Sequence, residues 1–424
     1  MASERAKKVV SMSAAVVLGC AAMSACAPGH GAYTSAFKER AERNMNMVKA
    51  GTGWDMARQR FLAGDLGKAL KGVDESIALA PDVSKSHRLR GRVLFEMGRL
   101  EDALAAFERA SELDAEDAKP HYFRGVIFER WSRFERALAA FEAAAAKDPS
   151  DPQHVVASAE MLMQLGRLDE AGEVLARAGG RFEHNAGVRQ TLGHLAMMRG
   201  EISAAVEAFE AACLLAPGEA GLLEDLARAQ AAAGRFSEAE GSLERVLRRS
   251  GEGGGDRRDL MHLRARCLME LDRPVEAMRL YEALVGGDGG GSDAEAWVGL
   301  GRSALVVGSE RRALGAGARL VEMAPSRAEG WALRAAALRA SGELEAAASS
   351  LSGAESLTVG GAEVLALRAS ILAELGRAGE AAASARAALE RAPGLRAARA
   401  VRAWTERGGV QDGAVVNVRV SPDG

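Results

Sequence analysis

The strongest constraint on the fold of this chain is a unit of 34 residues that recurs along most of its length. The stretches "GRLEDALAAFERASELD" (98–114) and "GEISAAVEAFEAACLLAP" (200–217) are variants of one pattern. Ten units can be aligned, with small inserts at 254–257 and 292–293. They begin at Ala50, Ser84, Ala118, Pro152, Ala186, Ala220, Arg258, Ala294, Ala328 and Ala362. A fixed period of this length is typical of a solenoid, in which each unit packs on its neighbours.

Small residues keep the register of these units. Position 20 is Ala in all ten units, position 8 is Gly or Ala in all ten, and position 15 is Gly in eight. A glycine at position 15 permits the backbone conformation that ends a helix, and the proline found at position 32 of five units stops the next helix. Each unit is therefore predicted to be two helices that approach closely, with Phe107, Phe141 and Phe209 at position 24 filling the space beside the small residues.

The pattern resembles that of the tetratricopeptide repeat family. In the eighth unit, Trp297, Leu300, Gly301, Ala304 and Gly308 stand at positions 4, 7, 8, 11 and 15. The resemblance implies an all-α, right-handed α-solenoid of about ten stacked helix-turn-helix repeats. Taken alone, Gly299-x-Gly301 resembles a dinucleotide-binding loop, but such a loop follows a strand, and the repeat register places these glycines within a helix.

Composition shifts divide the chain into segments. Gly-rich stretches flank the seventh unit, at 250–257 and 286–293. The predicted organisation is a signal peptide (1–25), a tether and lead-in helix (26–49), a block of six repeats (50–253), an insert-flanked seventh repeat (254–293), a block of three repeats (294–395), and a capping helix and tail (396–424).

The N-terminus has the layout of an export signal. The basic stretch "MASERAKK" precedes an apolar run over 9–23, which is short for a membrane-spanning helix. The sequence Met23-Ser24-Ala25-Cys26 resembles the bacterial lipobox, which implies cleavage before Cys26 and attachment of lipid to it. We therefore expect a lipoprotein on the periplasmic face of a bacterial membrane, in the outer membrane. The alternative is ordinary secretion, which would give a soluble periplasmic adaptor.

No motif for chemistry is present in the sequence. The formal net charge of −3 lacks the basic excess typical of nucleic-acid binding, so no nucleic-acid partner is expected. The seven histidines and four cysteines do not stand at metal-ligand spacings, and neither a P-loop nor a G-x-S-x-G sequence occurs. We predict a non-catalytic protein without catalytic residues, metal or cofactor. An envelope enzyme with an unrecognised site is the remaining alternative of another class.

The resemblance also implies a binding surface. In this family, positions 2, 5, 9, 12 and 13 of the first helices line a concave groove that binds protein segments. The predicted partner-binding residues are Lys85, Arg88, Arg92, Phe95, Lys119, Tyr122, Arg130 and Met197. Cations beside aromatic rings suit an acidic protein or peptide segment. The last repeats would be more acidic, with Glu329, Glu363 and Glu374. The alternative is that all of these are ordinary solvated helix faces.

Overall fold

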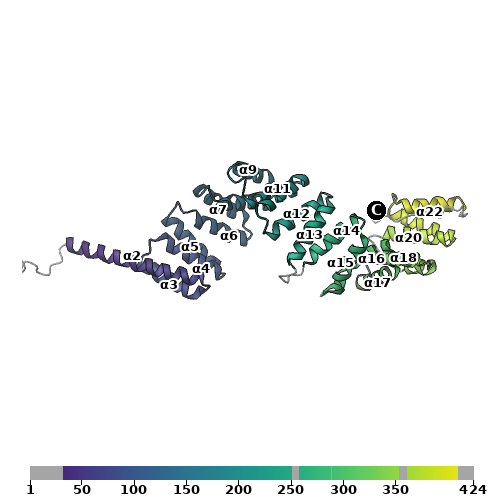
Figure 1. The fold of residues 1–424 in the computed structure, drawn as a ribbon, viewed down its shortest axis with the longest axis horizontal. Coiled ribbons are helices and arrows are strands. Elements are labelled where there is room, and N and C mark those ends of the chain that lie inside the picture. The colour runs from purple at the N-terminus through teal and green to yellow at the C-terminus, as the bar shows by residue number, and fades with distance from the viewer. Residues whose placement is uncertain (1–31, 251–256, 288, 353–360, 409–424) are drawn as a thin grey trace, which may run out of the picture. The chain divides into compact units, whose positions relative to one another are not determined.

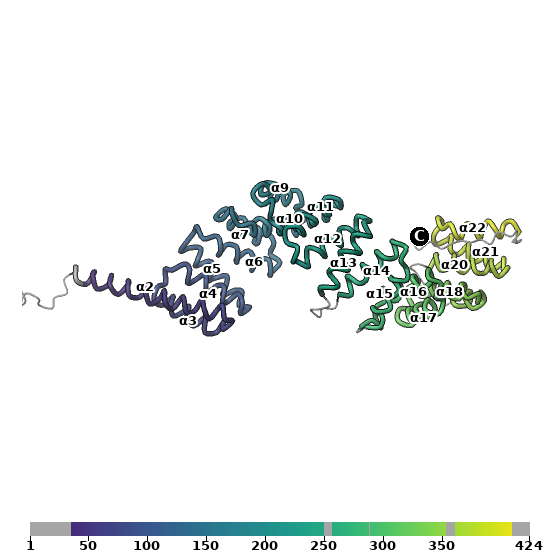
Figure 2. The backbone as a smooth tube through the Cα atoms, viewed as in Figure 1, coloured from purple at the N-terminus to yellow at the C-terminus, as the bar shows by residue number. Residues whose placement is uncertain are grey.

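The computed structural model describes residues 32–250, 257–287, 289–352 and 361–408, and within these ranges the chain is a succession of helices joined by short turns (Figure 1). It divides into two compact units, Met1–Arg181 and Phe182–Gly424. Figure 2 shows the helices of each unit following one another in pairs along the backbone.

The helices of unit 1 are α2 (Ala32–Leu62), α3 (Leu66–Leu79), α4 (Ser84–Glu96), α5 (Leu100–Leu113), α6 (Ala118–Arg130), α7 (Phe134–Lys147), α8 (Pro152–Gln164) and α9 (Leu168–Gly179). Those of unit 2 are α10 (Ala186–Arg199), α11 (Ile202–Leu215), α12 (Ala220–Ala232), α13 (Phe236–Ser250), α14 (Arg258–Glu270), α15 (Pro274–Gly286), α16 (Ala294–Val307), α17 (Glu310–Met323), α18 (Ala328–Ala340), α19 (Leu344–Ser350), α20 (Gly361–Glu374), α21 (Ala378–Arg391) and α22 (Arg396–Glu406), with the short 3₁₀ helix η1 (Gly290–Ser292) before α16.

The helix starts confirm the repeat register and the all-α solenoid fold. Eight helices begin at the residue predicted as position 1: α4, α6, α8, α10, α12, α14, α16 and α18. Position 15 has positive φ in all ten repeats, including the two where it is not glycine, Ser132 (φ 54°) and Asp272 (φ 56°). The turn between the paired helices therefore needs a left-handed residue whatever the side chain, and glycine is the residue that adopts this conformation most easily.

Small residues and rings form the core between the helices of each pair. All ten position-20 alanines are completely buried. Phe107, Phe141 and Phe209 are also buried, each with its ring against the position-8 glycine of its own repeat. A Cβ atom on Gly125 would lie 2.5 Å from Cε1 of Phe141, closer than two carbon atoms can approach, so glycine is required there.

The two ends of the described chain differ in detail from the prediction. The lead-in helix is continuous with the first helix of the first repeat, and together they form α2, in which Ala50 is the first buried residue. The predicted capping helix is present as α22, and it begins 34 residues after Ala362, where an eleventh repeat would start. Arg399 Nε donates to the carbonyl of Pro393 (2.9 Å), as Trp331 Nε1 does to Pro325 (2.9 Å), both at position 4. α22 thus occupies the place of the first helix of an eleventh repeat.

The boundary between the two compact units, Arg181/Phe182, was not predicted from the sequence. The division into blocks of six and three repeats stays a prediction. The signal sequence, Cys26 and the tail after 408 lie outside the described residues. Among the helices that the structure does describe, none combines the length and apolar character needed to span a bilayer.

Candidate protein-binding surface

The first helices of the first three repeats, α2, α4 and α6, place cations over aromatic rings, and the three that lie closest are Lys85, Arg92 and Arg130. Lys85 Nζ lies 4.7 Å from the ring centroid of Trp54, and the guanidinium of Arg130 lies 4.5 Å from that of Phe95. The guanidinium of Arg92 lies 4.9 Å from the Phe61 centroid and 5.6 Å from that of Phe123. We call these three cations and four rings the cation–aromatic surface: Lys85, Arg92, Arg130, Trp54, Phe61, Phe95 and Phe123.

The charges on this surface are accessible, since Lys85, Arg92 and Arg130 are exposed, whereas the rings are half-buried. Within the described ranges, no carboxylate lies within ion-pair distance of these three cations, although neighbouring Arg88, Arg90 and Arg124 all have such partners. The rings hold the cations in place and leave their N–H donors available to a ligand.

Holding a long side chain against a ring has a consequence for binding. Ordering a flexible lysine or arginine at an interface costs about 0.5–1.5 kcal/mol. An exposed cation–π contact, worth about 0.5–1 kcal/mol, offsets part of this cost before the partner arrives. The cation–aromatic surface is therefore partly preorganised for anionic groups.

The other predicted binding residues have different environments. Arg88 forms an ion pair with Asp117, and Asp117 Oδ1 accepts the backbone N–H of Lys119 (3.1 Å) at the start of α6. The guanidinium of Arg88 already has a carboxylate partner, Asp117, which caps the first helix of the next repeat. Arg88 therefore joins adjacent repeats, and we leave it out of the binding surface. Lys119 is exposed at the first turn of α6.

Tyr122 and Met197 are more enclosed than a free binding residue would be. The Tyr122 ring lies 5.5 Å from both the Phe141 and His154 rings and 5.7 Å from Phe123. Burial, with smaller contributions from nearby carboxylates, raises the pKa of Tyr122. Met197 belongs to unit 2, where it packs against the core cluster that contains Phe209.

Three rings of the surface were absent from the predicted set. Trp54 and Phe61 stand at positions 5 and 12 of the first repeat, so applying the groove positions to that repeat would have found both. Phe123 stands at position 6, outside the groove positions, and only the structure shows that its ring lies beneath Arg92.

The predicted acidic character of the last repeats is largely neutralised. Glu329 pairs with Arg327 (3.0 Å), and Glu374 pairs with Arg339. Glu363 is exposed. In unit 2, Asp225 accepts a hydrogen bond from Gln190 Nε2 (2.7 Å) and lies 3.1 Å from His194 Nε2.

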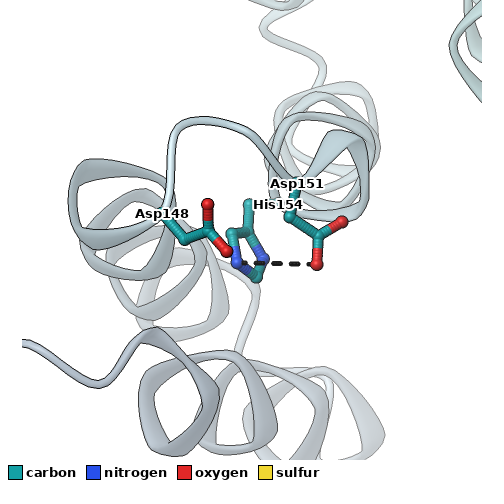
Figure 3. A group of neighbouring side chains, drawn as sticks. All are labelled: Asp148, Asp151 and His154. Carbon is teal, nitrogen blue, oxygen red and sulfur yellow. Dashed lines mark ion pairs between the residues drawn. The ribbon is translucent and has the colours of Figure 1, made fainter.

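Two further groups bear on chemistry. Gly299 and Gly301 lie within α16, where added Cβ atoms would meet Tyr281 and Leu333, so their small size serves packing. The structure also brings together Asp148, Asp151 and His154, a cluster not predicted from the sequence, whose potential ligand atoms all lie within 4.8 Å of one another (Figure 3). Its signal is the spacing D-x-x-D-x-x-H across a turn.

Stacked helix pairs in a common register define a class of repeat protein, the α-solenoids. Models of the tetratricopeptide repeat match residues 55–118, 88–152, 128–185, 191–254 and 224–294, and a further model of the same repeat matches 362–394. The chain belongs to the tetratricopeptide repeat family, and its repeats make it a protein-interaction scaffold.

Comparison with individual proteins gives more distant similarities. The chain is 33% identical over 192 residues to human tetratricopeptide repeat protein 34. The match covers 40% of this chain and 33% of that protein, so the chain spans about a third of the length of this relative. A tetratricopeptide repeat protein from Parabacteroides merdae has 16% identity and a TM-score of 0.44, with 56% of this chain and 92% of that chain covered. For PilF of Pseudomonas aeruginosa the identity is 19% and the TM-score 0.41, with 47% and 90% covered.

Proposed function

We propose that this protein is a non-catalytic scaffold of the bacterial cell envelope that binds an acidic segment of a partner protein on the cation–aromatic surface. The observation that carries the proposal is the set of three exposed cations, Lys85, Arg92 and Arg130, which rest on rings without a carboxylate partner among the described residues. Arg88, Arg90 and Arg124 on the same two helices do have carboxylate partners, so an unpaired arginine is not the rule on α4 and α6.

The mechanism is recognition by charge and contact area. Glutamate or aspartate side chains of the partner accept hydrogen bonds from Arg92 and Arg130, which can bind a carboxylate with two N–H groups, and from Lys85. Apolar side chains of the same segment pack on the exposed parts of Trp54, Phe61 and Phe95. Because the charges are exposed, binding weakens as the ionic strength rises.

The envelope location rests on the N-terminal sequence. A basic start, an apolar run and Cys26 in the setting Met23-Ser24-Ala25-Cys26 support an exported lipoprotein of the outer membrane. Metabolic labelling with a palmitate analogue tests the anchor: label is expected on the parent chain and absent from Cys26→Ser. Label that persists in the variant would overturn the anchor and leave a soluble periplasmic adaptor.

The binding surface is tested by crosslinking in native cells. The variant Arg92→Glu/Arg130→Glu reverses two charges of the surface and is expected to lose the partners captured by the parent. The control Lys71→Glu/Arg109→Glu makes the same change of net charge at exposed positions on the second helices α3 and α5 and is expected to retain them. If both variants capture the same partners as the parent, the partner binds elsewhere.

A further inference from the structure

The turn between α7 and α8 brings together two carboxylates whose orientation the backbone fixes. Asp148 Oδ1 accepts hydrogen bonds from the backbone N–H (3.1 Å) and the hydroxyl (2.6 Å) of Ser150. Asp151 Oδ1 accepts the backbone N–H of Gln153 (2.9 Å) at the start of α8. Each carboxylate is thus anchored through one oxygen, and for the second oxygen, Oδ2, no hydrogen bond is found among the described residues.

His154 completes the cluster from the first turn of α8. Its side chain is only 4% exposed, and Nε2 lies 4.0 Å from Asp151 Oδ2, beyond hydrogen-bond range. Among the described residues neither imidazole nitrogen has a hydrogen-bond partner, and Nδ1 is buried. In Figure 3 the imidazole ring lies between the carboxylates of Asp148 and Asp151. A buried polar group without a partner costs about 1–3 kcal/mol, so native proteins seldom retain one without a reason.

We propose that Asp148, Asp151 and His154 form a zinc-binding site with one imidazole and two carboxylate ligands. The set suits zinc, because Zn²⁺ binds imidazole nitrogen and carboxylate oxygen at about 2.0–2.2 Å in a tetrahedral arrangement. Ligands at that range lie roughly 3.4 Å from one another. The potential ligand atoms of the three residues now lie within 4.8 Å of one another. Small rotations of the two carboxylates would bring them to the ligand–ligand distance of a zinc site. Water supplies the fourth ligand, and the two carboxylates balance the ionic charge.

The surroundings of the turn favour a fixed site. Pro149 and Pro152 restrict its backbone, and Arg181 Nη1 donates to the carbonyl of Pro149 (2.6 Å). Hydrogen bonds from the backbone N–H and the hydroxyl of Ser150 hold the Asp148 carboxylate in one orientation. Hydrogen-bonded carboxylates of this kind are typical of metal ligands, because the bonds orient the ligand before the ion arrives.

A metal here would act on the scaffold. Asp148 follows the last residue of α7, and Asp151 and His154 belong to the start of α8, so the ion would clamp the junction between the third and fourth repeats. The His154 ring lies 5.5 Å from Tyr122, whose own ring contacts Phe123 of the cation–aromatic surface. Zinc binding would therefore stabilise unit 1 next to the proposed binding surface, whether or not that surface binds an acidic segment.

The test is calorimetric titration of the full-length, chelator-treated protein with zinc chloride. The parent is expected to show one saturable zinc site that also raises the melting temperature with zinc concentration, as for any ligand of the folded state. The variants Asp148→Asn, Asp151→Asn and His154→Gln are expected to bind at least about tenfold more weakly. Asn at position 151 still caps α8, so loss of zinc binding by Asp151→Asn does not result from unfolding.

The matched control is His184→Gln, which removes an exposed histidine elsewhere in the chain and is expected to bind zinc like the parent. Absence of saturable zinc binding in the parent would overturn the proposal. So would equal affinity in the parent, Asp148→Asn and His154→Gln, because zinc would then be held by other ligands, the thiols of Cys213 and Cys267 among them.

Discussion

At the scale of single residues, positions 8 and 24 have complementary volumes in the second to sixth repeats. Where position 24 is Phe, as at Phe107, Phe141 and Phe209, position 8 is Gly, and the ring occupies the space that a Cβ atom would need. Where position 24 is smaller, as in the pairs Ala159/Leu175 and Ala227/Leu243, position 8 is Ala. In these five repeats the sum of the two volumes therefore fits a fixed gap between the paired helices, whereas Ala265/Tyr281 and Gly301/Gly317 in the seventh and eighth repeats pack differently.

This complementarity predicts a coupled pair of mutations in the third repeat. Gly125→Ala alone is expected to lower the free energy of unfolding by about 1–3 kcal/mol, because the new methyl group displaces the buried Phe141 ring. The double variant Gly125→Ala/Phe141→Leu reproduces the combination of the fourth repeat, and its loss should be smaller than the sum of the two single losses. Urea denaturation of the four proteins measures the coupling.

The control is Gly67→Ala in α3, where an added Cβ meets no atom within 4 Å, and stability should stay equal or rise. Additive losses in the third repeat would show that the two positions do not share one gap.

Asp293 illustrates a residue whose charge stabilises the fold. Burial favours the neutral acid, but hydrogen bonds from the N–H of Ala296, from Arg258 (2.5 Å) and from His262 (2.9 Å) outweigh it and lower the pKa of Asp293 to about 2. Because the folded pKa is lower than the unfolded value, the ionised form stabilises the fold above about pH 4 by about 2 kcal/mol. This contribution is lost as the pH falls from about 5 toward 2.

Asp293→Asn should therefore be less stable than the parent at pH 7 by about 2 kcal/mol, and the difference should shrink toward pH 2. Asn retains the helix cap of α16, so the comparison isolates the charge. Chemical denaturation of both proteins at several pH values measures it, and a constant difference over that range would contradict the assigned role.

At the scale of helices and turns, the sequence predicted the register closely, because Gly at position 15 follows from the left-handed turn and Ala at position 20 from the close packing of the paired helices. It did not predict that α2 runs unbroken from Ala32 to Leu62, since Gly51 and Gly53 are common helix breakers and here lie within the helix. The cation–aromatic surface was predicted in part. Positions within a repeat follow from the pattern, whereas contacts between rings and cations of successive repeats depend on side-chain conformations.

The turn at position 15 gives a prediction at this scale. Asp272 has φ 56°, a conformation that costs a non-glycine residue about 1 kcal/mol relative to glycine. Asp272→Gly should raise the melting temperature, and Asp272→Ala should lower it or leave it unchanged, since alanine is strained in the same way. Thermal denaturation compares the three proteins, and destabilisation by Gly would show that the side chain of Asp272 matters more than its backbone.

At the scale of the whole molecule, the chain is a scaffold of helix pairs in two compact units, and its chemistry is distributed over surfaces. Unit 1 carries both the cation–aromatic surface and the proposed zinc site. In unit 2, several cations and acids of the described residues pair with each other, as at Arg339/Glu374 and Arg327/Glu329. We therefore expect recognition of an acidic partner to depend on unit 1.

The most direct test of this account is fluorescence anisotropy with a labelled Glu-rich peptide that contains two aromatic residues, and a Lys-rich peptide of equal length as control. We expect saturable binding of the Glu-rich peptide to the full-length protein, weaker at high salt. Arg92→Glu/Arg130→Glu should weaken it at least about tenfold, corresponding to about 1.4 kcal/mol, and Lys71→Glu/Arg109→Glu should not. Equal binding of both peptides, or equal loss in both variants, would contradict the claim that this surface recognises acidic segments.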